Sequence, residues 1–87
     1  MPKIEKKLII RSRQGLHARP AAVFVQIANK YSSVISVRKG QDEVNGKSIM
    51  GMLMLGADCG SEVEMMVEGV DAEAMFAELE AYLAKED

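Results

Sequence analysis

The chain has 87 residues, of which 48% are hydrophobic and 28% are charged, and this balance predicts one globular domain rather than a disordered or fibrous chain. Its formal net charge of −2 provides no overall positive field for nucleic acid or for an acidic membrane surface. His17 and Cys59 are the only histidine and the only cysteine, so the sequence excludes an internal disulfide and a zinc site with the usual ligand spacing, and we expect no cofactor.

No segment approaches the ~20 apolar residues needed to cross a bilayer, and the early lysines are not followed by the apolar run of a signal peptide. We therefore expect a cytoplasmic protein without direct membrane insertion, in which residues 1–87 form a single domain. Basic side chains gather in the first quarter of the chain, around His17, whereas acidic side chains dominate after Ser61. A basic end of this kind suits an anionic ligand or an acidic partner.

The first two predicted elements are a strand and a helix. Alternation of apolar and charged residues predicts a half-buried strand over residues 3–11, with an inward face formed by Ile4, Leu8 and Ile10. Gly15 then permits a break, and a helix is predicted from Ala18 to about Lys30, because Pro20 is tolerated in a first helical turn. The apolar stripe of this helix consists of Phe24, Ile27, Ala28 and Tyr31.

The next elements form a predicted hairpin and a short helix. Residues 33–39 predict a strand with Ile35 and Val37 on one face, and a turn leads to the start of a third strand at residues 43–44. The almost wholly apolar segment 48–55 predicts a short helix, because Ser48 suits its N-cap and Gly56 suits the position after its end. Such a helix cannot bury every side.

Residues 63–67 alternate cleanly and predict the last strand. Asp71 is expected to cap a final helix with a buried stripe made of Ala72, Met75, Phe76, Leu79 and Leu83. The order is therefore strand, helix, strand, strand, short helix, strand, helix. The economical arrangement is an α+β two-layer sandwich, in which an antiparallel four-stranded sheet carries helices on one face.

His17 marks the predicted junction between the first strand and the first helix. A histidine there lies over the backbone N–H groups of the first turn, which carry the positive end of the helix dipole and bind anions. Arg19 adds a permanent charge with a planar fork that suits phosphate oxygens, so the pattern indicates a phosphohistidine site. The alternative is a plain interaction or nucleic-acid-binding domain in which His17 is only a cap; the acidic last strand argues against nucleic acid.

Two segments together resemble a known family. Residues 15–21, Gly-Leu-His-Ala-Arg-Pro-Ala, and residues 44–51, Val-Asn-Gly-Lys-Ser-Ile-Met-Gly, are similar to the paired signatures of the histidine-containing phosphocarrier (HPr) family of the bacterial sugar phosphotransferase system. Length and element order match over essentially the full chain. The resemblance implies an open-faced βαββαβα sandwich with three helices on one side of the sheet, and a phosphoryl carrier rather than an enzyme.

The resemblance also implies specific roles. His17 would accept a phosphoryl group through Nδ1 from phosphorylated enzyme I, which phosphoenolpyruvate charges, and would pass it to enzyme IIA domains of sugar permeases. Arg19 and the backbone N–H of Ala18 would stabilise the phosphate. Ser48, by its residue type an N-cap worth roughly 1 kcal/mol, would also be a regulatory phosphorylation site for HPr kinase/phosphorylase.

Part of the short apolar helix must stay exposed, which is typical of a docking surface in which methionine adapts to several partners. The predicted partner contacts are Leu16, Ala22, Gln26, Asn29, Ile49, Met50 and Leu53, whereas Met52 and Leu55 are expected in the core.

Two residues depart from the pattern of the family. Gln14 replaces a shorter polar residue, and Cys59, which stands in place of lysine, is interpreted as a neutral loop residue. Residues 47–51 favour the sugar-transport branch, the nitrogen-related regulatory branch is the alternative, and a monomer is expected.

Overall fold

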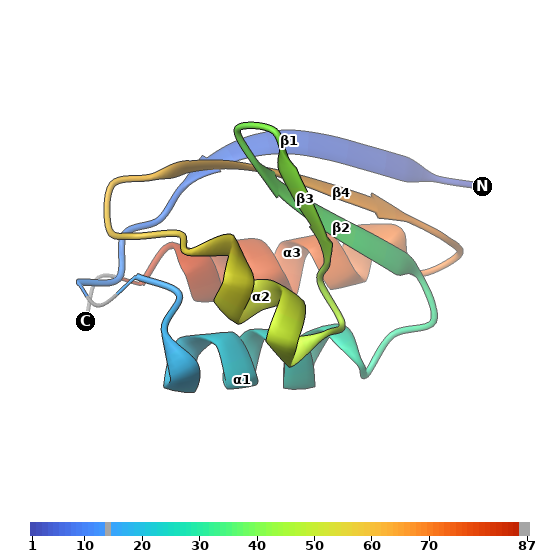
Figure 1. Cartoon of the computed structure of the whole chain (residues 1–87). Coiled ribbons are helices and arrows are strands. Elements are labelled where there is room, and N and C mark those ends of the chain that lie inside the picture. The colour runs from blue at the N-terminus through green and yellow to red at the C-terminus, as the bar shows by residue number, and fades with distance from the viewer. Residues whose placement is uncertain (14, 86–87) are drawn as a thin grey trace.

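A computed structural model describes residues 1–13 and 15–85 and shows one sheet with helices on one side (Figure 1). The elements in chain order are β1 (Lys3–Ile9), α1 (Ala18–Ala28), β2 (Val34–Lys39), β3 (Asp42–Asn45), α2 (Ile49–Leu55), β4 (Glu62–Glu68) and α3 (Ala72–Leu83). This order and the α+β sandwich are as predicted. Among the described residues, no helix is long and apolar enough to cross a membrane.

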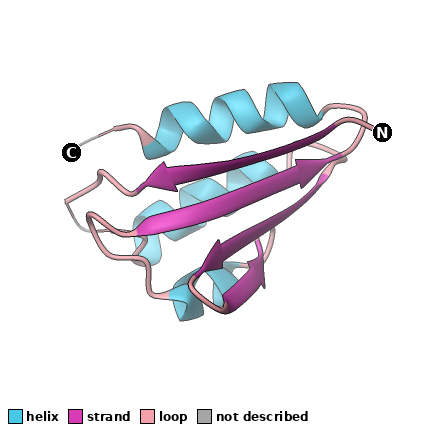
Figure 2. Cartoon of the chain, turned by 90° about the horizontal axis from the view of Figure 1, so that it is seen from above, coloured by secondary structure: helices cyan, strands magenta, loops and turns pink. Residues whose placement is uncertain are grey.

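The four strands pair antiparallel in the order β1-β4-β2-β3, so β4 lies in the middle of the sheet between β1 and β2 (Figure 2). In β4 the predicted alternation is confirmed, because Val63, Met65 and Val67 are buried while the residues between them are not. Strand β1 ends at Ile9, earlier than predicted, and Ile9 is exposed whereas Ile10 is buried just beyond the strand.

The helices bury their apolar stripes against the inner face of the sheet. All five residues predicted for the last helix are buried, and in α1 the buried residues are Ala21, Phe24 and Ala28. Helix α1 ends at Ala28 with Asn29 as its C-cap, so Tyr31 lies beyond the helix, although it still packs against the core. The core therefore lies between the sheet and α1, α2 and α3.

Asp71 stands at the N-cap position of α3, but its predicted capping role is wrong because its carboxylate makes no cap hydrogen bond. The carboxylate instead accepts the backbone N–H groups of Ser32 and Ser33, each at 2.9 Å, and both serine hydroxyls. These bonds satisfy Ser33, the one buried polar residue among the described side chains. Asp71 thus fastens the α1–β2 loop to the start of α3.

This contact gives a prediction for acid stability. The Ser33 hydroxyl and the Ser32 backbone N–H lower the pKa of Asp71 from the ordinary value of 3.8 to about 2. A carboxyl whose pKa is lower in the folded state stabilises the fold above its unfolded pKa, and this stabilisation is lost as the pH falls through about 4 towards 2. Asp71→Asn should therefore be less stable than the parent at neutral pH, with a difference that shrinks in acid. Urea unfolding of both proteins across this pH range measures their free energies of unfolding. A difference between the two free energies that does not change with pH would contradict the role given to the Asp71 carboxylate.

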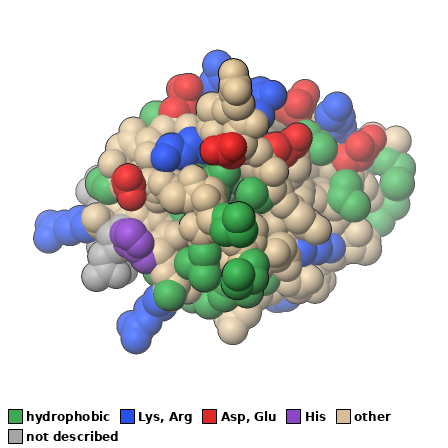
Figure 3. All heavy atoms as spheres, viewed as in Figure 1, with side chains coloured by type: hydrophobic (Ala, Val, Ile, Leu, Met, Phe, Trp, Pro, Cys, Tyr) green, Lys and Arg blue, Asp and Glu red, His purple; other side chains and the backbone are tan. Residues whose placement is uncertain are grey.

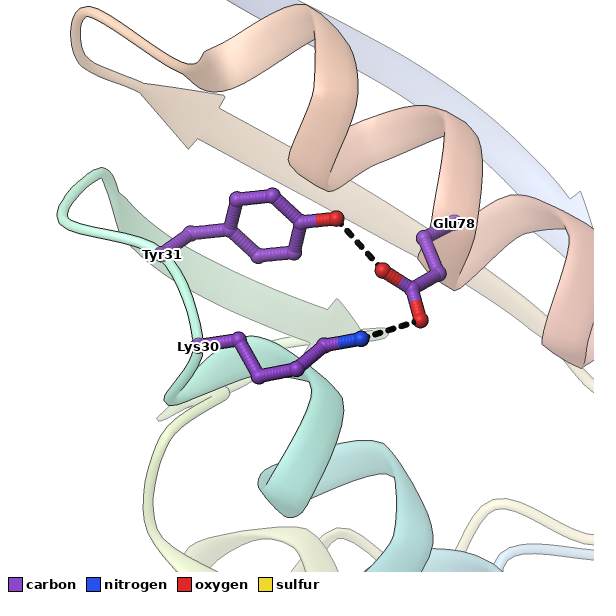
Figure 4. Close-up of polar contacts among 3 residues, drawn as sticks. All are labelled: Lys30, Tyr31 and Glu78. Carbon is purple, nitrogen blue, oxygen red and sulfur yellow. Dashed lines mark hydrogen bonds and ion pairs between the residues drawn. The ribbon is translucent and has the colours of Figure 1, made fainter.

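A second polar contact fastens the end of α1 to α3 (Figure 4). The Lys30 ammonium lies 2.6 Å from one carboxylate oxygen of Glu78, and the Tyr31 hydroxyl donates to the other oxygen. Both hydrogen bonds, that of Lys30 first, lower the pKa of Glu78. The C-terminal end of α1 is thereby held at a defined position relative to α3.

Candidate functional site

His17 is the N-cap residue of α1 and has an extended backbone conformation. Its side chain is exposed and makes no cap hydrogen bond to the described residues, so His17 occupies the N-cap position without capping the helix through its imidazole. The imidazole projects from the surface at one end of the molecule, as the space-filling view shows (Figure 3). It is therefore accessible to a partner protein.

The first turn of α1 forms an anion-binding environment beside this imidazole. The His17 carbonyl accepts the N–H of Ala21 at 2.8 Å, which starts the helical ladder. The N–H groups of Ala18 and Arg19 precede this ladder and have no acceptor within the helix, and Pro20 contributes no donor. The exposed Arg19 guanidinium adds a full positive charge at the same helix end. The arrangement can stabilise a phosphoryl group on His17.

The segment that leads to His17 is held by the loop of residues 57–61, for which the sequence predicts no role. Leu16 donates its N–H to the Ala57 carbonyl at 2.8 Å, and Ile10 exchanges backbone hydrogen bonds with Gly60 and Ser61. Gly15 has φ 67°, and a Cβ there would lie 2.6 Å from the Ala57 carbonyl oxygen. The glycine therefore permits a close backbone approach, a role that the sequence does not reveal because the two loops are distant in the chain.

Three predictions about individual residues have different outcomes in this region. Leu16 is only 4% exposed and belongs to the core, so its prediction as a partner contact is wrong for this structure. Cys59 is exposed in the 57–61 loop, with Sγ 3.9 Å from the Arg11 carbonyl oxygen. The prediction for Gln14 lies outside the described residues.

Helix α2 presents an exposed apolar surface on the face that also carries His17 (Figure 3). Ile49, Met50 and Leu53 are 41%, 65% and 39% exposed, whereas Met52 and Leu55 are buried as predicted. Met54 is 78% exposed and was missed, although a helix of seven mostly apolar residues with one buried side has to expose the others. We call Ile49, Met50, Leu53 and Met54 the α2 patch.

Ser48 caps α2, as predicted, because its hydroxyl accepts the Gly51 N–H at 3.1 Å. Its neighbour Lys47 is bound to the far end of α1: the Asn29 amide donates to the Lys47 carbonyl at 3.3 Å, and the Lys47 ammonium donates to the Tyr31 carbonyl at 2.7 Å. His17 lies at the opposite end of α1, which has 11 residues and is roughly 16 Å long. Ser48 and His17 are therefore separated, with the α2 patch and the predicted contacts Ala22 and Gln26 between these two ends.

Comparison with known proteins assigns the family. A family model described as PTS HPr component phosphorylation site matches residues 4–85, which include both His17 and Ser48. This chain is a member of the PTS HPr family. The phosphocarrier protein HPr of Treponema pallidum is 43% identical over 77 residues, which cover 88% of each chain.

Two solved structures of HPr relatives support the same assignment. The crystal structure of HPr from Bacillus anthracis has a TM-score of 0.90 and 41% identity, and the match covers 93% of this chain and 96% of that one. The crystal structure of Crh, the catabolite repression protein of Bacillus subtilis, has a TM-score of 0.77, 40% identity and 95% coverage of each chain, and that protein forms a swapped dimer. The family includes phosphocarrier proteins such as HPr, which are not catalysts in themselves, and the regulatory HPr-like protein Crh.

Proposed function

We propose that His17 is the phosphoryl acceptor of this HPr family member, receiving its group from phosphorylated enzyme I and donating it to enzyme IIA domains. In each step a phosphorus–nitrogen bond to one histidine breaks as the bond to the next histidine forms, so the carrier needs only positioning and charge stabilisation. The observation that carries the proposal is the exposed imidazole at the start of α1, beside Arg19 and the free end of the helical N–H ladder.

A reconstituted relay tests the whole proposal. The chain is incubated with enzyme I and labelled phosphoenolpyruvate, and an enzyme IIA domain is then added. We expect an acid-labile, base-stable label on this chain that moves to the enzyme IIA domain. A chain that takes up no label from enzyme I would contradict the carrier function. A label that moves to no sugar-specific enzyme IIA domain would favour the regulatory, nitrogen-related branch.

The α2 patch is the proposed docking surface, together with Ala22 and Gln26 on α1. Its exposed methionines can adapt to the different surfaces of enzyme I and enzyme IIA. Asn29 holds the start of α2 against the end of α1, so it serves this surface by positioning rather than by direct contact. A phosphoryl group on His17 can then be transferred to a partner protein that is bound to α2.

Ser48 is the proposed regulatory site for HPr kinase/phosphorylase. A phosphate there would add about −1.5 to −2 charges beside the α2 patch, about one helix length from His17. It would therefore act on docking rather than on the phosphohistidine directly. A carboxylate or phosphate can also keep the N-cap interaction with Gly51, so the fold is expected to persist.

The Ser48→Asp variant should accept phosphoryl groups from enzyme I more slowly than the parent and melt at nearly the same temperature. Ser48→Asn is the matched control, because asparagine caps a helix without adding charge. It should transfer at the parent rate. The measurement is the initial rate of phosphorylation by enzyme I, with a melting curve for each variant; equal rates for the aspartate and asparagine variants would contradict a charge-based control of docking.

We propose a monomer as the unit that meets these partners, although Crh forms a swapped dimer. The hydrophobic core of the described residues is formed between the sheet and the three helices of one chain. Light scattering at several protein concentrations measures the molecular mass directly. A molecular mass equal to two chains at low protein concentration would contradict the proposal of a monomer.

A further inference from the structure

A cavity of about 290 Å³ lies beside the candidate phosphoryl site, between the end of β1, the start of α1 and the end of α3. Figure 1 shows how the C-terminal end of α3 comes close to the loop that follows β1. None of the roles assigned above to the docking surface or to Ser48 uses this cavity. It shares Leu16, Arg19 and Pro20 with the segment that forms the candidate phosphoryl site.

The walls of the cavity differ in chemistry from its rim. Ile10, Leu16 and Leu83 form an apolar floor and are 1%, 4% and 7% exposed. Tyr82, which is half-buried, also lines the cavity. Two cations, Arg19 and Lys85, stand at the opening, and the Lys85 ammonium lies 5.9 Å from the centre of the Tyr82 ring. No acidic residue lines the cavity within the described part of the chain.

We propose that this cavity binds a small aromatic anion, that is, one ring that carries a single carboxylate or phosphate group. The apolar floor and the Tyr82 ring match the flat body of such a ligand, and the two cations match its charged head. A volume near the lower end of known ligand pockets limits the ligand to about one ring with its head group. The two cations at the rim favour an anionic ligand, and the apolar floor favours a ring over a bare anion.

The effect of binding on phosphoryl transfer rests on the function proposed above. Arg19 lines the cavity and also follows His17 by two residues in the first turn of α1, so a bound anion and a phosphoryl group would compete for the same guanidinium. The ligand should therefore slow phosphorylation of His17. Binding itself requires no phosphorylation and can be measured without enzyme I.

The binding experiment is an NMR titration of the full chain with phenyl phosphate, benzoate, benzyl alcohol and inorganic phosphate. We expect the two aromatic anions to shift the resonances of Ile10, Leu16 and Leu83 saturably. Benzyl alcohol, which has the ring without the charge, should bind about tenfold more weakly, because a hydrogen bond to a charged group is lost. Inorganic phosphate should leave the three apolar residues unshifted.

Lys85→Gln removes one rim charge and should weaken phenyl phosphate binding about threefold, since an exposed charge contributes modestly. Lys3→Gln, an exposed lysine in β1, is the matched control and should bind as the parent does. Shifts that do not saturate, or inorganic phosphate acting on the same residues as the aromatic anions, would overturn the proposal. If the chain binds phenyl phosphate but takes no phosphoryl group from enzyme I, the proposed carrier function fails while the cavity site stands.

Discussion

The His17→Ala variant should accept no phosphoryl group from phosphorylated enzyme I and should unfold at nearly the parent temperature. The imidazole is exposed and makes no cap hydrogen bond, so its removal costs the fold little and stability should stay within about 0.5 kcal/mol of the parent. It is also the sole histidine of the chain, so no other imidazole can replace it. Labelled phosphoenolpyruvate with enzyme I measures acceptance, and thermal unfolding measures the fold.

The Arg19→Gln variant tests the stabilising role of Arg19 separately from the acceptor role of His17. This variant keeps His17 and should still be phosphorylated, but about tenfold more slowly, because a charged hydrogen bond to the phosphate is lost. Label on His17→Ala, or equal rates for Arg19→Gln and the parent, would contradict the roles given to these residues.

Gly69→Ala should cause the largest loss of stability among single-residue changes considered for the fold, about 3 kcal/mol. Gly69 has φ 152°, a region that essentially only glycine adopts, and a Cβ would lie 2.6 Å from the Ser33 Cα and 2.7 Å from the Ser33 Cβ. Ser33 cannot move away without losing hydrogen bonds, because its backbone N–H and its hydroxyl both donate to the Asp71 carboxylate. Relief of the overlap would break the connection between the α1–β2 loop and α3.

Gly40→Ala is the matched control for this prediction. Gly40 also has a positive φ, 61°, but a Cβ there would have no neighbour within 4 Å among the described atoms. Its substitution should cost about 1 kcal/mol, from backbone strain alone. Chemical denaturation of both variants measures the difference; similar losses would show that the close approach at Ser33 is not important.

Local patterns sufficed for the element order and for the short helix. Alternation predicts β4, periodicity predicts α3, and Ser48 with Gly56 predicts both ends of α2, because each of these signals comes from neighbours in the chain. The same kind of reasoning failed at Asp71. An aspartate before a helix usually caps it, but here the loop after α1 supplies better donors, and this competition is invisible in the local sequence.

The geometry of the candidate site was only partly predictable. The junction at His17 and the exposure of Ile49, Met50 and Leu53 follow from the sequence, whereas the exposure of Met54 was missed. The close approach of Gly15 to the 57–61 loop depends on a contact between distant segments. The burial of Leu16 and the placement of Ser48 at the far end of α1 likewise depend on how the helices pack. The sequence shows which functional side chains the chain contains, and the tertiary structure determines which of them lie close together.

We expect the phosphoryl group to reside on His17, and NMR of the phosphorylated chain tests this placement most directly. The chain is made with nitrogen-15-labelled histidine and phosphorylated by enzyme I and phosphoenolpyruvate. We expect one phosphorus signal that couples to Nδ1 of His17 and disappears on mild acid treatment. A phosphorus signal with no coupling to the imidazole, or an acid-stable signal on a hydroxyl such as that of Ser48, would contradict it.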